Sequence, residues 1–83
     1  MLPDFDTLHA EFVRVDARMK NIHDEMAPYS AAIQAGGELR MREQERFYRM
    51  AGEYARLLAE RDRICAALAR LRPGWSVASS PLS

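Results

Sequence analysis

The sequence predicts an all-α fold, an antiparallel two-helix hairpin that dimerises into a four-helix bundle. Apolar residues recur at alternating spacings of three and four through both halves of the chain, the heptad a/d pattern of helices that pack side by side. Gly36 and Gly37 interrupt this pattern near its middle. The chain has only 83 residues, and a chain this short buries only about 60% of its unfolded surface by itself. Chains with such a small core are commonly stabilised by oligomerisation.

The first helix is predicted over residues 4–35. Asp4 or Asp6 is a suitable N-cap, because a carboxylate accepts hydrogen bonds from the free N–H groups of the first turn. Pro28 would cost ~3 kcal/mol or more in a helix interior, but the heptad register continues beyond it. We predict a helix kinked at Pro28; the alternative is a break at Ala27 and a separate short turn. The predicted interface residues of this helix are Phe5, Leu8, Phe12, Val15, Met19, Ile22, Met26 and Ile33.

Residues 36–37 are predicted to form the turn, since paired glycines suit a tight reversal. Glu38 is expected to open the second helix, residues 38–72, where its charge meets the positive end of the helix dipole. A short connection makes the two helices antiparallel neighbours. The apolar face of this helix is wider than a simple coiled-coil seam, which favours a bundle. Its predicted interface residues are Phe47, Met50, Tyr54, Leu57, Leu58, Ile64, Leu68 and Leu71.

The two ends of the chain are expected to lie outside the helices. Residues 1–3 form a short lead, and Pro73 with Gly74 stops the second helix. Residues 73–83 are small and polar, which predicts a flexible tail. Trp75 is in phase with the a positions and is expected to fold back as an anchor.

Charge is balanced overall but divided between the halves. Twelve basic residues match twelve acidic ones. Residues 1–37 hold six acidic and three basic residues, a balance of −3, and residues 38–83 hold six acidic and nine basic residues, a balance of +3. Complementary halves suit two helices lying side by side. They do not favour nucleic acid as the partner.

Five arginines of the second helix form a stripe with a spacing of seven residues: Arg42, Arg49, Arg56, Arg63 and Arg70. A glutamate lies three or four residues before each of the first four, and such helix pairs contribute ~0.2–0.5 kcal/mol each. We interpret the stripe as a solvated, salt-bridged outer face. A nucleic-acid surface and a surface for an acidic protein are the alternatives.

The candidate partner-binding residues are Arg40, Arg42, Arg46, Tyr48, Arg49, Arg61 and Arg70. Arginine beside an aromatic ring, as near the turn, occurs both at protein hot spots and in contacts with nucleic acid. Arg61 occupies an a position, where an unpaired buried charge is costly. Pairing across the hairpin with Glu11 or Asp16 would satisfy it. The alternative is a device that selects register or partner.

No residue pattern points to catalysis or to a cofactor, and we expect neither an enzyme nor a metal site. His9, Asp16 and His23 lie ~10 Å apart along one helix, too far to share one ion. Cys65 has no histidine nearby in the sequence and is interpreted as a small buried residue. A single cysteine and an acidic start without a secretory pattern lead us to expect a cytoplasmic protein without a membrane segment.

The layout of residues 4–72 resembles several small bacterial helical-hairpin proteins: the Rop-type RNA-binding hairpins of plasmid copy control, quorum-sensing antiactivators, and small secretion chaperones. Residues 33–37, "IQAGG", are similar to the inter-helix turn of conjugation antiactivators. The resemblance is one of shape and implies stoichiometric binding. We therefore expect a protein–protein interaction module of the adaptor, antiactivator or chaperone type, whose partner is a second copy or another helical protein. The alternatives are a Rop-like RNA-binding bundle and a small subunit of a larger helical assembly.

Overall fold

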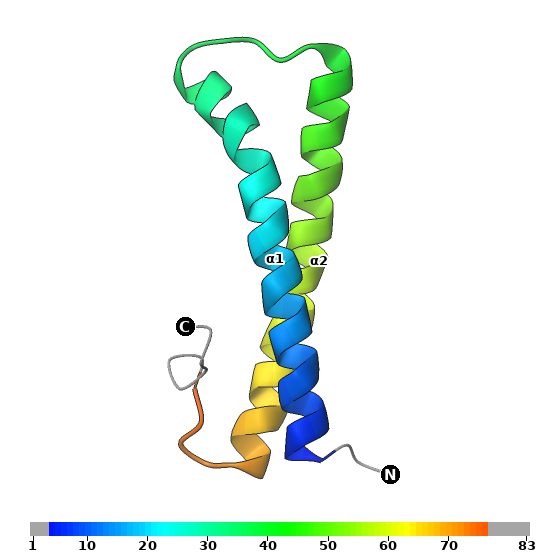
Figure 1. Cartoon of the computed structure of the whole chain (residues 1–83), viewed down its shortest axis with the longest axis vertical. Coiled ribbons are helices and arrows are strands. Elements are labelled where there is room, and N and C mark those ends of the chain that lie inside the picture. Colours follow the sequence, from blue (N-terminus) through cyan, green and yellow to red (C-terminus); the bar gives the residue numbers. More distant parts are fainter. Residues whose placement is uncertain (1–3, 77–83) are drawn as a thin grey trace.

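A computed structural model describes residues 4–76 and shows two long helices, α1 (Phe5–Gln34) and α2 (Met41–Leu71). They run antiparallel and pack against each other along most of their length (Figure 1). The Cα atoms extend over 47 × 24 × 14 Å, so the hairpin is one helix thick. The predicted all-α hairpin is confirmed for a single chain. Neither helix combines the length and hydropathy that crossing a bilayer requires.

Asp4, one of the two N-caps that the sequence offered, sets the start of α1. Its backbone is extended, with φ −78° and ψ 171°, and its carboxylate Oδ1 accepts a 2.8 Å hydrogen bond from the Thr7 N–H. This bond stabilises the charged carboxylate and lowers the pKa of Asp4 below its usual value of 3.8.

Replacing Asp4 with alanine should lower the melting temperature at neutral pH, because the Thr7 N–H loses its acceptor. A lowered pKa in the folded state means that the stabilisation is present above the unfolded pKa of 3.8 and is lost as pH falls through the folded pKa. Thermal melts followed by circular dichroism should therefore show a difference between wild type and Asp4→Ala that shrinks below about pH 3.8. Asp6→Ala, which removes a first-turn charge but no cap, is the control and should cost less.

The helix α1 continues through Pro28 without a break, so the alternative of a separate turn after Ala27 is excluded. Figure 1 shows α1 and α2 diverging toward the turn. The end of α1 is fixed by two backbone hydrogen bonds, from Gly36 N to Ile33 O and from Gly37 N to Ala32 O. Gly36 has φ +82°, a conformation that favours glycine. A Cβ at Gly37 would lie 3.0 Å from the Ala32 carbonyl oxygen.

The start of α2 differs from the sequence expectation. The helix begins at Met41, not Glu38, and residues 35–40 form the connection. No Ser, Thr, Asp or Asn is available near Glu38 to cap a helix there. Glu43 caps the start of α2, because its Oε1 accepts a hydrogen bond of 3.3 Å from the Arg40 N–H. Gln44 Nε2 donates to the Leu39 carbonyl at 3.0 Å, which holds the connection against the first turn of α2.

The main core lies at the end of the hairpin away from the turn. One buried cluster joins the two helices and consists of Leu8, Phe12, Val15, Met19, Ile64 and Leu68. Phe5, Tyr54 and Leu57 pack against it and are partly buried. Ile22 and Met50 are also buried, closer to the turn. These a and d residues confirm the predicted heptad register in both helices.

Several predicted interface residues remain uncovered in the single chain. Ile33 is 48% exposed, Leu71 48% and Leu58 37%, while Met26 and Phe47 are half-buried. The six-residue connection lets the helices separate near the turn, so Ile33 has no close neighbour on α2 to cover it. Leu58 flanks the a/d stripe and faces away from α1.

At the other end, α2 stops at Leu71 and the chain turns back at Gly74, which has φ +92°. The Trp75 N–H donates to the Arg72 carbonyl at 3.0 Å, and the indole packs against the core. The expected anchoring role of Trp75 is confirmed. The predicted lead, residues 1–3, and most of the predicted tail, residues 77–83, lie outside the described residues.

Candidate binding surface

The helix α2 has two flanks of opposite character on either side of its a/d stripe. What we term the apolar flank comprises the b and e positions: Met41, Gln44, Tyr48, Ala51, Ala55, Leu58, Asp62, Cys65 and Ala69. What we term the arginine flank comprises the c and g positions: Arg42, Arg46, Arg49, Glu53, Arg56, Glu60, Arg63, Ala67 and Arg70. Asp62 is the one charged residue of the apolar flank, whereas every residue of the arginine flank except Ala67 is charged. Met41, Tyr48 and Leu58 of the apolar flank are exposed, whereas Cys65 packs partly against the core.

Three hollows open on the same side as the apolar flank. The one beside the turn, about 430 Å³, is lined in part by Ile33, Leu39, Phe47 and Tyr48. A second, about 320 Å³, is lined by His23, Met26, Ala27, Ser30, Ala31, Gln34 and Tyr54. A third, about 200 Å³, lies between the middle turns of the helices near Asp16 and Arg61. The hollow of about 320 Å³ is the mainly apolar one of these three, whereas the hollow of about 200 Å³ is lined by the charged side chains of Asp16, Lys20, Asp24 and Arg61.

We predicted that glutamates would form salt bridges with the arginine stripe, and this prediction is wrong. Within residues 4–76, Arg42, Arg49, Arg56, Arg63 and Arg70 make no ion pair. Glu38 lies before α2 and cannot act as a helix neighbour of Arg42. Glu53 reaches across the hairpin instead, where its Oε1 lies 3.1 Å from Arg18 Nη2. The remaining i,i+3 and i,i+4 pairs are exposed to water, where such attraction is weak.

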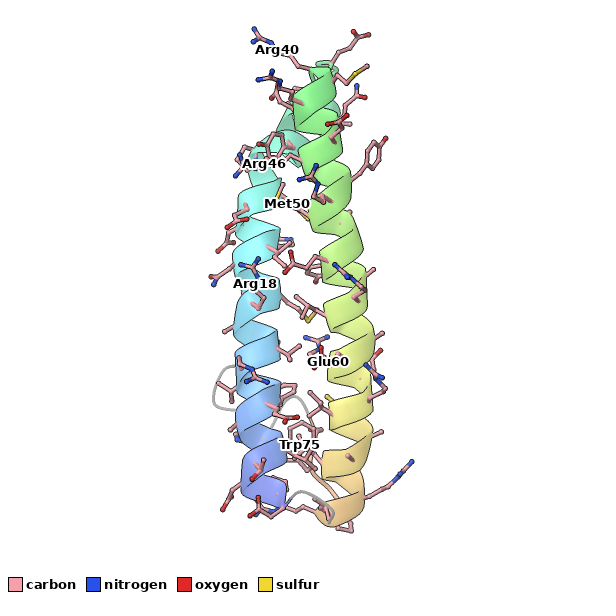
Figure 2. All side chains as sticks on the ribbon, turned by 90° about the vertical axis from the view of Figure 1, so that its right-hand side faces the viewer. Arg18, Arg40, Arg46, Met50, Glu60 and Trp75 are labelled. Atoms are coloured by element: carbon pink, nitrogen blue, oxygen red, sulfur yellow. The ribbon has the colours of Figure 1, made fainter. Side chains whose placement is uncertain are left out.

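The other candidate residues near the turn are also solvent-exposed. Arg40 is the N-cap residue of α2, and Arg46 makes no ion pair within the described part of the chain. Tyr48 is 70% exposed, and its ring lies edge-on to Phe47 with centroids 6.1 Å apart. Arg40 lies at the turn end and Trp75 toward the opposite end (Figure 2).

Arg61 does not belong to an open surface, because it pairs across the hairpin. Its Nη1 lies 3.0 Å from Asp16 Oδ1, one of the two partners, Glu11 and Asp16, that the sequence offered. Asp16 Oδ2 also lies 3.2 Å from Lys20 Nζ. The Asp16 side chain is only 9% exposed and that of Arg61 25%. Arg61 Nε is buried without a hydrogen-bond acceptor, so this charged group in the seam is only partly satisfied.

An aromatic cluster at the end away from the turn was not predicted. His9 stacks on Phe5 at 5.8 Å and on Phe12 at 6.2 Å. The Trp75 ring stands edge-on to Phe12 at 5.4 Å and to His9 at 6.4 Å, and the Arg72 guanidinium lies 3.8 Å above the Phe5 ring. The i, i+4, i+7 spacing of Phe5, His9 and Phe12 could have indicated this stack.

Reactive groups are sparse on the apolar side. Cys65 is a free thiol, and burial raises its pKa, so the reactive thiolate is disfavoured. Among residues 4–76, histidine, cysteine and carboxylate side chains do not gather in any group of three or more.

Comparisons of this chain with protein-family models, with curated proteins and with solved structures give no match. The candidate surface therefore has to be interpreted from its own geometry.

Proposed function

We propose that this chain is a non-enzymatic protein–protein interaction module that forms a homodimeric four-helix bundle and acts by stoichiometric binding, as adaptors, antiactivators and chaperones do. The observation that carries the proposal is the uncovered apolar flank of α2. A helix that exposes an apolar flank needs a partner for it, since large contiguous apolar patches are rare on monomers. A second copy of the same chain is the simplest partner.

The shape of the hairpin supports this choice. Its Cα atoms extend over 47 × 24 × 14 Å, so each helix has a helical neighbour on one side only. Docking a second copy along a hairpin that is one helix thick would turn the flank into the core of a four-helix bundle.

Light scattering after size exclusion tests the proposal. At micromolar concentration we expect twice the chain mass of 9.5 kDa. Leu58→Glu, which places a charge in the middle of the apolar flank, should give the monomer mass, because an unpaired charge in an apolar interface is costly. Ala59→Glu, on the outward face of the same turn, is the matched control and should stay dimeric. A monomeric wild-type chain would refute the proposed dimer.

One observation favours a second candidate function, nucleic-acid binding by a Rop-like bundle. The five-arginine stripe of α2, which makes no ion pair within residues 4–76, presents positive charge at intervals of ~10.5 Å. Titration with a short RNA hairpin at increasing salt concentration tests whether the chain binds nucleic acid. Binding through this stripe requires an affinity that falls steeply, with a logarithmic slope of roughly −4 for five phosphate contacts. No binding at low salt would eliminate this candidate.

A further inference from the structure

We propose that residues 72–75, which we term the strap, open and close over the start of α1 while both helices stay formed. The proposal goes beyond the proposed dimer and does not depend on it, because every contact that supports it lies within one chain. The start of α1 and the end of α2 lie at the same end of the hairpin (Figure 1). The strap therefore reaches α1 directly from the last turn of α2.

Two side chains of the strap contact the start of α1. The Arg72 guanidinium lies 3.8 Å from the centre of the Phe5 ring, which is a cation–π contact. The Trp75 ring stands edge-on to Phe12 and His9, with ring centroids 5.4 Å and 6.4 Å apart, an arrangement that aromatic pairs favour. The closed strap thus covers an aromatic face of α1 that consists of Phe5, His9 and Phe12.

The backbone of the strap is hydrogen-bonded toward α2. The Arg72 N–H donates to the Leu68 carbonyl at 2.9 Å, and the Trp75 N–H donates to the Arg72 carbonyl at 3.0 Å. Neither bond joins the strap to α1. The position of the strap against α1 therefore depends on the side-chain contacts of Arg72 and Trp75.

The buried core is built without the strap. The residues of its buried cluster come from α1 and α2 alone: Leu8, Phe12, Val15, Met19, Ile64 and Leu68. Trp75 packs against this cluster from outside and is itself only half-buried. Segments with few buried apolar contacts open locally at a lower free-energy cost than the core. The strap should therefore open under milder conditions than those that unfold the helices.

Gly74 directs the strap back toward α1. Its φ of +92° belongs to a conformation that residues with a Cβ rarely adopt. A Cβ added at Gly74 would meet no atom within 4 Å, so the backbone conformation alone opposes alanine there. Gly52, in the middle of α2, has the same open space around it, but its backbone is helical and accepts alanine. The two glycines form a matched pair for substitution.

Gly74→Ala and Gly52→Ala test the hinge in the full chain. In Gly74→Ala the ratio of open to closed strap should rise on the order of tenfold, because an alanine at positive φ is strained. Acrylamide should then quench the single tryptophan more strongly, and its emission should move to longer wavelength. Circular dichroism at 222 nm should stay unchanged, because the helices remain formed. Gly52→Ala should leave the quenching and the emission as in wild type.

Urea titration of the wild-type chain at one fixed protein concentration tests whether the strap opens by itself. The tryptophan emission should change at a lower urea concentration than the circular dichroism at 222 nm. Coincident transitions would overturn the strap, and so would unchanged quenching or a loss of helical signal in Gly74→Ala. These outcomes are distinct from a failure of the proposed dimer, because a monomeric wild-type chain with an early tryptophan transition would refute the dimer and support the strap.

Discussion

Replacing Phe12 with alanine should lower the free energy of unfolding by about 3–5 kcal/mol, the usual cost of removing a buried phenylalanine ring. Phe12 is fully buried, at 0% exposure, and belongs to the cluster that joins the two helices. The Phe12 ring also contacts the Trp75 ring edge-on, with the ring centroids 5.4 Å apart. A chain of 83 residues is expected to have a total stability of only about 4–12 kcal/mol, so this single change removes a large part of it.

Urea unfolding at one fixed protein concentration gives the comparison, since the stability of the proposed dimer would depend on concentration. Ile33→Ala is the matched control, because Ile33 occupies the same heptad position in α1 but is 48% exposed. It should cost under about 1 kcal/mol. Phe12→Leu, which keeps an apolar side chain, remains measurable if the alanine variant does not fold. Equal costs for Phe12→Ala and Ile33→Ala would contradict the location of the core.

Trp75 offers a second readout, as the chain has a single tryptophan. The fluorescence emission of Trp75 should shift to longer wavelength in Phe12→Ala under native conditions. The indole loses its contact with the Phe12 ring and becomes more exposed to solvent. In Ile33→Ala the emission should stay unchanged, since Ile33 lies near the turn, far from Trp75. An unshifted spectrum in a folded Phe12→Ala variant would argue against the aromatic cluster.

The heptad pattern predicted the larger features because they depend on periodic burial. Residues such as Leu8, Val15 and Ile64 recur in phase over many turns, and tertiary packing follows that phase closely. A cross-helix partner for Arg61 was predictable because the connection fixes which turns of the two helices lie at one level. That argument left both Glu11 and Asp16 as candidates, and the structure selects Asp16. The anchoring position of Trp75 was predictable because Trp75 is in phase with the a positions and follows the helix stop at Gly74.

Features that depend on local competition were not predictable in this way. Glu38 has the right charge to begin a helix, but Glu43 can bond back to the Arg40 N–H, and that bond places the helix start. Glu53 has both Arg56 on its own helix and Arg18 on α1 within reach, and the two choices differ by fractions of a kcal/mol. The sequence contains both options and does not rank them.

The apolar flank lies between these two cases. Ala51, Leu58 and Cys65 follow the heptad as strictly as the core does, and the sequence shows that the apolar face is wide. It does not show which part of that face α1 covers. The structure resolves this, because α1 covers the a/d stripe and leaves Met41, Tyr48 and Leu58 of the flank exposed.

Replacing Asp16 with alanine should cost about 2–3 kcal/mol, because it leaves Arg61 in the seam without its carboxylate. Breaking a fully buried ion pair costs about 3–5 kcal/mol, and Arg61, 25% exposed, can recover part of this by turning toward water. Arg18→Ala is the matched control. It breaks the other cross-helix pair, whose side chains are 49% and 37% exposed, and should cost under about 1 kcal/mol. Urea unfolding of both variants compares them directly, and a larger cost for Arg18→Ala would contradict the buried pair.

The double variant Asp16→Leu with Arg61→Met separates stability from register. We expect it to be as stable as wild type or more so, because apolar residues that replace a buried ion pair often stabilise by about 1–4 kcal/mol. A slip of one heptad between the helices would set Arg61 against His9 or His23 and leave Asp16 with Lys20 as its only ion-pair partner, so the native pair disfavours that slip. The double variant lacks this penalty, and we expect its amide spectrum to show extra peaks from slipped hairpins. A double variant with one set of peaks would mean that the turn alone sets the register, and one as unstable as Asp16→Ala would mean that the pair itself stabilises the fold.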